Sequence, residues 1–559
     1  MSVDFQALTF DYAPRADQHA VAPVRRPVVI VGAGPVGLAL AIDLAQRGVP
    51  VVVLDNDHRL STGSRAICFA KRTLEIFDRL GCGDRMVAKG VSWNVGKVFL
   101  RDAQVYRFDL LPDAGHQRPA FINLQQYYVE GYLAERAREL ALVDLRWRNE
   151  VVDTQPQADH VTLTIATPDG QYRLEADHVV ACDGSRSALR RHLGLESKGR
   201  AFRDRFLIAD VRMTHEAPAE RWFWFDPAFH PNQSVLLHRQ PDGVWRIDFQ
   251  LGWDADPEEE KKPEKIIPRV KALLAHSAMK DAGFTLEWAS VYTFSCQRME
   301  RFRHGRVLFA GDAAHGVSPF GARGANSGVQ DADNLGWKLA AVLRGHAPDA
   351  LLDTYARERE AAADENIRHS TRATDFITPK SAASRLFRDA VLSLARTQPF
   401  ARTLVNSGRL STPTILHGSS LNTPDSHAFA GTMVPGAAAA DAPVTQADGR
   451  DGWLLKQLGD GFNALVGADG ELEHVLQGLA MPGFALSVLA IVPAGARAGD
   501  ALVDRDGAIA RRYDLQPGTA VLLRPDGHVC ARWRDPTPER VQAAMRRALA
   551  LPEGALPCP

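Results

Sequence analysis

Three glycines stand at the spacing that a phosphate-binding turn requires. The sequence GAGPVG at residues 32–37 directly follows a short apolar run, and a second apolar run ends at Asp55. Gly32, Gly34 and Gly37 would allow a tight turn and bring the backbone close to a pyrophosphate at the start of the following helix. Asp55 would accept hydrogen bonds from a ribose. The spacing predicts a strand–helix–strand unit that binds a dinucleotide, FAD or NAD, against the alternative of a glycine-rich turn without a ligand.

Two later segments repeat the pattern of an apolar strand that leads into a Gly/Asp turn. The run HVVAC leads into Asp183 and Gly184, and the run RVLFA leads into Gly311 and Asp312. Apolar residues then recur at helical spacing over residues 329–343, which predicts an amphipathic helix. Four strands of this type indicate one doubly wound α/β sheet assembled from distant segments.

These ordered segments resemble the FAD-dependent aromatic hydroxylases typified by para-hydroxybenzoate hydroxylase, and most closely the branch acting on 3-hydroxyphenylpropionate and phenols. The resemblance covers about residues 25–400. It implies that Asp183 and Gly184 serve FAD and the nicotinamide donor, and that Asp312 binds the ribityl chain. The other FAD contacts that we expect are Arg65, Gln126, Gly311, Pro319, Gly324, Ala325 and Asn326.

The resemblance also implies a chemistry: FAD as cofactor, NADH or NADPH as co-substrate, and O2. The oxidant in this family is a hydroperoxide on flavin C4a, whose distal oxygen is electrophilic and attacks electron-rich rings such as phenolates. The N–H groups and dipole at residues 324–326, where the helix is expected to begin, would stabilise negative charge on the pyrimidine edge of reduced flavin. We therefore predict a monooxygenase that hydroxylates a small phenolic or related aromatic substrate.

Two other functions stay open on the sequence alone. One is flavin-dependent epoxidation of another electron-rich substrate, and the other is a non-catalytic flavin- or nucleotide-binding protein whose terminal domain recruits partners. Halogenation is disfavoured, because Trp222 and Trp224 resemble part of the halogenase WxWxIP segment but residues 225–227 do not complete it.

The substrate groups are expected on a different kind of segment. Residues 203–253 contain alternating stretches such as VWRIDFQ, which predicts antiparallel strands with one face on a cavity or on solvent. The expected catalytic groups are Arg246, His238 and Tyr292, and the expected substrate contacts are Trp224, Asp248, Gln250 and Phe320. The alternative is an edge strand with ordinary solvent-facing residues. For His315, a packing or backbone-bonding role is favoured over catalysis.

The predicted fold class is α/β: a Rossmann-like FAD-binding domain with a parallel sheet, an interleaved mixed-sheet substrate domain and a C-terminal thioredoxin-like domain. The likeness to thioredoxin lies around residues 512–513 and 523–527, but no CxxC pair is present. The terminal domain is therefore expected to have a structural role or to form a dimer contact. The expected boundaries are 1–26 for an N-terminal extension, 27–200 and 296–400 for the FAD domain with 90–125 partly in the substrate domain, 201–295 for the substrate domain, 401–445 for a linker and 446–559 for the terminal domain.

The composition excludes several other classes. Lys and Arg number 66 against 67 Asp and Glu, which leaves a formal charge of -1. The chain therefore has no net positive charge that would attract nucleic acid or an acidic membrane. The six cysteines show neither a CxxC pair nor zinc-ligand spacing, which predicts reduced thiols in a cytoplasmic protein without a metal site. No apolar run is long enough to span a bilayer. The expected partners are a small aromatic substrate and O2, and a homodimer is left open.

Overall fold

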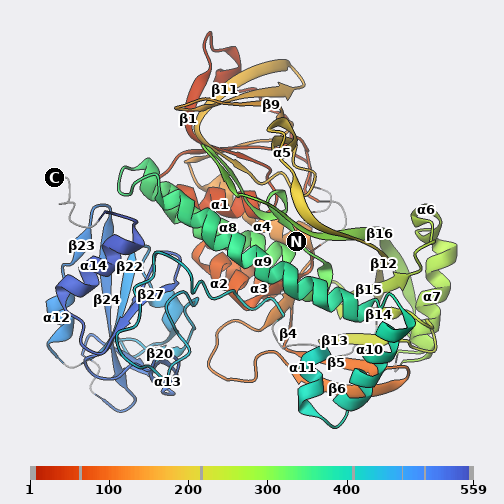
Figure 1. Ribbon diagram of the computed structural model, residues 1–559. Helices are drawn as coiled ribbons and strands as arrows, with labels where there is room; N and C mark the ends of the chain where they lie inside the picture. The colour runs from red at the N-terminus through yellow and green to blue at the C-terminus, as the bar shows by residue number, and fades with distance from the viewer. Residues whose placement is uncertain are drawn as a thin grey trace.

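The computed structural model describes residue 5 and residues 8–61, 66–214, 218–277, 279–405, 410–468, 470–496 and 499–552. It contains three units, each built around one large sheet, and the long helix α9 (Leu351–Ile377) crosses the molecule beside them (Figure 1). We call them the first, second and third units in order of their sheets along the chain.

The first unit contains the predicted parallel sheet. Strands β18, β11, β1, β2 and β8 lie side by side in this order and run parallel. The strands β1, β2, β11 and β18 carry buried runs of Val, Ile, Leu and Ala, as expected for a sheet with both faces covered. The strands are β1 (Val24–Val31), β2 (Val51–Leu54), β8 (Val143–Arg146), β9 (Glu150–Pro156), β10 (Val161–Thr167), β11 (Gly170–Ala181), β17 (Arg303–His304) and β18 (Val307–Phe309). The helices are α1 (Pro35–Gln46), α2 (Lys71–Arg79), α3 (Gly83–Lys89), α4 (Gln126–Glu139), α5 (Ala188–His192) and α8 (Gly324–Leu343), after the short 3-10 helix η1 (Ala16–His19).

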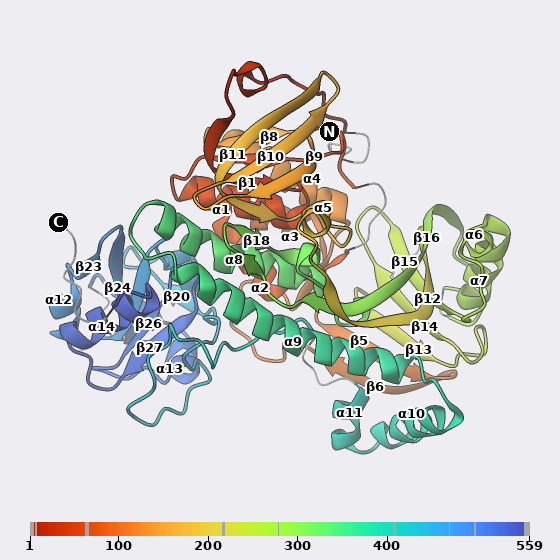
Figure 2. The same cartoon turned by 45° about the horizontal axis from the view of Figure 1, so that its top comes forward.

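The second unit is a mixed sheet in the order β19-β16-β12-β15-β14-β13-β5-β6, antiparallel except where β13 pairs with β5. Figure 2 shows β12 and β16 as two long strands that lead from the first unit into this sheet. One face packs on α7 through an apolar core. The strands are β5 (Val95–Leu100), β6 (Ala103–Asp109), β12 (Ser197–Met213), β13 (Arg221–Phe225), β14 (Ser234–Arg239), β15 (Val244–Leu251), β16 (Phe284–Met299) and β19 (His315–Gly316). The helices are α6 (Pro257–Glu260), α7 (Pro263–Ala275), α10 (Ala382–Ala395) and α11 (Pro399–Val405), and a small sheet joins β3 (Cys68–Ala70), β7 (Phe121–Asn123) and β4 (Val91–Trp93).

The third unit is a separate mixed sheet with helices, in the order β21-β20-β25-β24-β22-β26-β27. Its sheet begins at β20, three residues before the expected boundary at 446. Residues 410–442 precede this sheet and pack along it, for example where Gly436 N donates to the Val529 carbonyl (2.7 Å). The elements are β20 (Pro443–Thr445), β21 (Asp451–Trp453), η4 (Leu454–Gln457), β22 (Phe462–Gly467), α12 (Leu472–Leu476), β23 (Ala480–Met481), β24 (Phe484–Pro493), β25 (Leu502–Asp504), α13 (Ala508–Tyr513), β26 (Ala520–Leu523), β27 (Val529–Trp533) and α14 (Pro538–Ala548).

A buried group of charges joins the third unit to the first, and we call it the interface ion cluster. Glu358 of α9 accepts hydrogen bonds from Arg524 Nη1 and Lys338 Nζ, both at 2.7 Å, and Arg524 Nη2 also donates to Asp526 at 2.7 Å. Trp337 of α8 lies beside this cluster and belongs to the apolar core of the third unit. The helix α8 therefore packs against both the first and the third unit.

The predicted fold class is confirmed, and the helix expected over residues 329–343 begins at Gly324 as anticipated. Among the residues that the structure describes, no helix is both long and apolar enough to cross a membrane.

Candidate active site

The predicted turns meet at one edge of the first sheet. Because β1, β2, β11 and β18 are parallel neighbours, the turns that follow them all lie at the carboxyl edge. The backbone joins them directly: Gly32 N donates to the Leu54 carbonyl and Cys182 N donates to the Val31 carbonyl, each at 2.8 Å. Segments separated by some 280 residues in the sequence thus form a single edge, since the turn after β18 begins at Gly311.

Two of the three glycines in the first turn leave no room for a side chain. Gly32 has a φ of +108°, and a Cβ there would lie 2.4 Å from the Cys182 carbonyl oxygen. A Cβ on Gly37 would lie 1.9 Å from the carbonyl oxygen of Gly32. A Cβ on Gly34 would meet nothing within 4 Å, so open space lies beside the start of α1. Tight packing behind the turn and free space before the helix are what a pyrophosphate at this position needs.

Asp55 supports the same turn. Its Oδ2 accepts a hydrogen bond from Ala33 N at 2.6 Å, and its Oδ1 accepts one from Asp57 N at 2.8 Å. Burial raises the pKa of Asp55, and the two backbone donors oppose that shift. Each carboxylate oxygen keeps a lone pair after these contacts, so the residue can still accept a ribose hydroxyl.

The turn after β11 contains an unsatisfied buried oxygen. Asp183 Oδ2 accepts hydrogen bonds from Ala188 N (2.7 Å) and Leu189 N (3.2 Å) at the start of α5. Asp183 Oδ1 is buried and has no hydrogen-bond partner within the described parts of the chain. Gly184 beside it has a φ of +75° and open space where a Cβ would stand. A ligand hydroxyl donating to Oδ1 would resolve the unsatisfied position.

The turn after β18 rests on a buried carboxylate. Asp331 accepts hydrogen bonds from Gly311 N (2.9 Å) and Arg359 Nε (2.6 Å), and its Oδ2 lies 2.6 Å from His315 Nε2. Burial opposes ionisation, but His315 and Arg359 lower the pKa of Asp331. His315 is fully buried beneath the turn, whereas Asp312 is exposed on it. Asp331, with its partners His315 and Arg359, thus fixes the backbone of the turn on which Asp312 lies.

The start of α8 lies next to this turn. A Cβ on Gly324 would be 3.9 Å from Asp312 Oδ1, with no closer obstruction than 3.8 Å. Asn326 anchors the first turn of the helix, because its side chain accepts a hydrogen bond from Ala70 N (2.8 Å) and donates to the Cys68 carbonyl (2.8 Å). The helix is 20 residues long, and its first N–H groups have no intrahelical partners. They are available to stabilise negative charge.

Gln126 is the first residue of α4 and contacts the segment in which Arg65 was expected to act. Its Oε1 accepts a hydrogen bond from Ala66 N (3.1 Å), and its Nε2 donates to Ser61 Oγ (3.1 Å) and Glu130 Oε1 (2.8 Å). Arg65 itself lies outside the described residues.

A row of polar side chains crosses the second sheet. Strand registers place Arg221 of β13, His238 of β14, Arg246 of β15 and Asp210 of β12 directly opposite one another, so they share one face. Arg246 is 2% exposed and binds Asp210 through two hydrogen bonds of 2.8 and 2.7 Å. Arg221 Nη2 donates to the Phe320 carbonyl at 3.1 Å. This polar face therefore meets the segment that leads into α8.

Asp248 lies two residues beyond Arg246 on the same face. Its Oδ2 is 3.9 Å from His238 Nε2. Burial raises the pKa of Asp248 to about 6, and Arg246 opposes that shift. Burial, assisted by Arg221 and Arg246, lowers the pKa of His238 well below its usual range. Near neutral pH the face therefore carries an ionised Asp248 and a neutral His238.

Tyr292 and Gln250 lie on the polar face of the sheet, whereas Pro319 and Phe320 lie in the segment before α8. Burial raises the pKa of Tyr292, which interacts electrostatically with Asp248. Gln250 Oε1 accepts a hydrogen bond from Ser234 N (3.0 Å). Phe320 is buried against Phe206, with ring centroids 4.8 Å apart. Pro319, just before it, is exposed at the start of the short 3-10 helix η3 (Pro319–Gly321).

Trp224 does not join the polar face. It lies opposite Val235, which in turn lies opposite Phe249, and all three belong to the apolar core beneath α7. Side chains alternate along a strand, so Trp224 points away from the face that carries Arg221. We therefore withdraw it as a substrate contact.

Sequence reasoning missed Arg221, Asp210 and Asp331. The first two belong to strands whose neighbours in the sheet are distant in the sequence, so nothing local showed that they would face Arg246. Asp331 lies within a predicted helix, where its spacing of 20 residues from Gly311 carried no recognisable signal.

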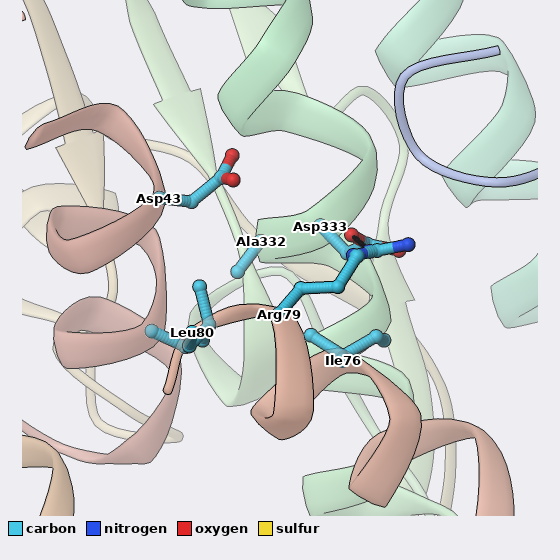
Figure 3. Close-up of a pocket in the computed structure, with 7 residues that line it drawn as sticks. Asp43, Ile76, Arg79, Leu80, Ala332 and Asp333 are labelled. Atoms are coloured by element: carbon cyan, nitrogen blue, oxygen red, sulfur yellow. Dashed lines mark hydrogen bonds and ion pairs between the residues drawn. The ribbon is translucent and has the colours of Figure 1, made fainter. Parts of the chain in front are cut away.

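A small, partly open pocket in the first unit is not a candidate site. It has a volume of about 10 Å³, is lined by Ala39, Asp43, Ile76, Arg79, Leu80, Ala332 and Asp333, and lies between α1, α2 and α8. Figure 3 shows Arg79 and Asp333 side by side, where they form an ion pair, with Asp43 on the facing helix. The volume suits at most one water molecule, so no aromatic ring fits there.

Comparison with known proteins agrees with this geometry. A family model described as an FAD binding domain matches residues 25–370. A 6-methylpretetramide 4-monooxygenase of Streptomyces rimosus is 32% identical over 557 residues, 95% of either chain. The chain belongs to the FAD-dependent aromatic hydroxylases. Another similar relative within this hydroxylase family is a 3-(3-hydroxy-phenyl)propionate/3-hydroxycinnamic acid hydroxylase of Mycobacterium sp. (strain JLS), 30% identical over 548 residues, 94% of this chain and 92% of the relative.

Solved structures of the hydroxylases show the same arrangement of units. The flavin-dependent monooxygenase PieE, in complex with FAD and substrate, has a TM-score of 0.79 and 25% identity and covers 95% of this chain and 100% of its own. The anhydrotetracycline hydroxylase OxyS from Streptomyces rimosus has a TM-score of 0.69 and 27% identity over the same shares. The predictions of an FAD cofactor and an aromatic monooxygenase are confirmed.

Proposed function

We propose that this hydroxylase inserts one atom of O2 into a small phenolic or related aromatic substrate, with NADH or NADPH as the reductant. The observation that carries the proposal is the contact between the two halves of the site: the buried polar face of β13–β15 meets, through Arg221 and Phe320, the loop that leads into α8. A substrate held between them would lie beside the cofactor.

The carboxyl edge of the first sheet would hold FAD. The turn at residues 32–37 and the start of α1 fit the pyrophosphate, and Asp55 fits a ribose. Asp183 and Asp312 would contact the cofactor further along, and the N–H groups at the start of α8 would face the flavin's pyrimidine edge. When bound, FAD would supply the redox chemistry that activates O2 with electrons from the nicotinamide.

The second sheet would prepare the substrate. Removing the proton from a phenol raises the electron density of its ring, which favours attack by an electrophilic oxygen. Asp248 is the suitable proton acceptor, because its pKa of about 6 leaves it ionised near neutral pH. Arg246, fixed by Asp210, would stabilise the resulting negative charge. Tyr292 keeps its proton and would donate a hydrogen bond to the same ring substituents.

The test uses purified protein loaded with FAD. NADH and NADPH consumption would be followed with a panel of phenolic acids, quinolones and hydroxypyridines, with peroxide and hydroxylated product measured in parallel. We expect at least one substrate to accelerate consumption and to yield a product heavier by one oxygen. A protein that binds no flavin, or whose nicotinamide oxidation is indifferent to every arene, would overturn the proposal. An epoxide in place of a phenolic product would indicate the alternative chemistry.

A further inference from the structure

Arg221 is a buried cation for which the described part of the chain supplies no carboxylate partner. Its side chain is 6% exposed, and the hydrogen bond to the Phe320 carbonyl is its one polar contact among the described residues. In that part of the chain no carboxylate oxygen lies within 4.0 Å of its guanidinium. A guanidinium has five N–H donors, so most of them remain for something else. Keeping a charge buried without a close anion costs free energy, which points to an anion that the described residues do not supply.

Arg246 provides the contrast within the same row. It lies opposite His238, as Arg221 does on the other side, and is equally buried. Its charge is matched by Asp210 through two hydrogen bonds. Among the described residues the same sheet therefore pairs one arginine with a carboxylate and leaves the other with a single carbonyl.

Asp248 is the complementary group on this face. It is 8% exposed, and no hydrogen bond reaches its carboxylate within the described residues. Its shortest contact with a basic group is the 3.9 Å to His238. A buried carboxylate that accepts no hydrogen bond from the described residues requires a hydrogen-bond donor.

The two unsatisfied groups lie within reach of one molecule. Arg221 is on β13 and Asp248 is on β15, with β14 between them, and both project from the same face. Neighbouring strands are about 4.8 Å apart, so the two backbones are separated by about 10 Å. One long side chain and one aromatic ring span such a distance.

We propose that Arg221 binds an anionic oxygen of the substrate, while Asp248 accepts a hydrogen bond from a hydroxyl group of the same molecule. The inference rests on the proposed function, because it concerns the same site, and it narrows the substrate class to hydroxyarenes that bear a second, negatively charged oxygen. That oxygen belongs either to a carboxylate or to an ionised hydroxyl.

Matched ligand pairs distinguish these two sources. The FAD-loaded protein is titrated with 3-(3-hydroxyphenyl)propionate and its methyl ester for the carboxylate. For the ionised hydroxyl it is titrated with 4-nitrocatechol, which keeps one hydroxyl after the other ionises, and with 2-methoxy-5-nitrophenol, in which the ionising hydroxyl is methylated. Binding is read from the change in flavin absorbance and by calorimetry. We expect the anionic member of at least one pair to bind about 30-fold or more tightly than its neutral partner, as for a buried hydrogen-bonded charge pair.

The variant Arg221→Gln should abolish this preference and keep its FAD. Arg221→Lys should retain part of it, because the charge stays but the forked geometry is lost. The control is Arg212→Gln, at an exposed arginine of the same sheet that pairs with Glu287, and it should keep the full preference.

The outcomes separate this inference from the proposed function. A wild-type protein that binds neutral and anionic partners equally, or binds neither, would overturn the inference whatever the variants do. So would an Arg221→Gln protein that keeps the preference. If the wild-type protein hydroxylates arenes in either case, the proposed function stands while the role of Arg221 falls.

Discussion

Replacing Asp248 by asparagine should stabilise the folded protein at neutral pH. Burial raises the pKa of this carboxyl group from 3.8 to about 6. A raised pKa means that ionising the carboxyl group costs more free energy in the folded protein than in the unfolded chain. The ionised group therefore destabilises the folded state at pH values above that pKa. Asparagine removes the charge and keeps the shape. Because no hydrogen bond to Asp248 is found in the described parts of the chain, none is lost.

The magnitude follows from the two pKa values. A difference of about 2 units, from 3.8 to about 6, corresponds to about 3 kcal/mol of unfolding free energy at pH 7. The penalty is complete above about pH 6 and shrinks as the pH falls, because the folded protein takes up the proton first. By about pH 4, where the unfolded carboxyl is also partly protonated, less than about 1 kcal/mol remains.

Thermal and urea unfolding at pH 7.5 and pH 4.5 would measure this effect. Asp210→Asn is the matched control, since the same chemical change on the neighbouring strand removes the partner of Arg246. That variant should lose about 3–5 kcal/mol, because a buried arginine is left without its anion. An Asp248→Asn protein that is less stable than wild type at pH 7.5, or equally stabilised at both pH values, would refute the reasoning. The stabilised variant should nevertheless hydroxylate more slowly, because it lacks the proton acceptor.

Three further substitutions test the carboxyl edge of the first sheet, where FAD is proposed to bind. Gly37→Ala should prevent FAD binding, because its Cβ would stand 1.9 Å from the Gly32 carbonyl oxygen, and flavin absorbance after gel filtration would show it. Asp312→Ala should weaken FAD retention by removing an expected ribityl hydrogen bond of about 1 kcal/mol, and full occupancy after dialysis would contradict that role. Asp331→Asn should lower both the unfolding temperature and FAD affinity, because Arg359 and Gly311 N lose a charged acceptor. Normal affinity in that variant would show that the turn does not depend on the carboxylate.

The cofactor edge was predictable from the sequence because its residues have strict local requirements. Gly32 occupies a backbone conformation that favours glycine, and Gly37 sits where no Cβ fits. Such residues follow apolar runs that read as buried parallel strands without knowledge of the rest of the fold. The carboxyl ends of parallel strands then meet by topology alone, and the family resemblance implied that Asp183 and Asp312 serve the cofactor there.

The substrate side was harder because strand order is not local. The alternation in VWRIDFQ gave the shared face of Arg246, Asp248 and Gln250. It did not reveal that β13 extends this face with Arg221, nor that Asp210 neutralises Arg246, although His238 of β14 was among the expected catalytic groups. Trp224 was assigned to the wrong side for the same reason, since an aromatic residue suits both a pocket and a core.

The interface ion cluster links the third unit to the helices α8 and α9 through buried hydrogen bonds. Glu358 belongs to α9 and Lys338 to α8. The cation and the carboxylate that complete their charge balance, Arg524 and Asp526, come from a loop more than 160 residues later. The third unit, which has no CxxC pair, therefore has a structural role in the packing of α8 and α9. It packs against α8, the helix whose first turn is proposed to face the flavin, so removing the third unit should weaken FAD binding even though that unit is not itself proposed to contact the cofactor.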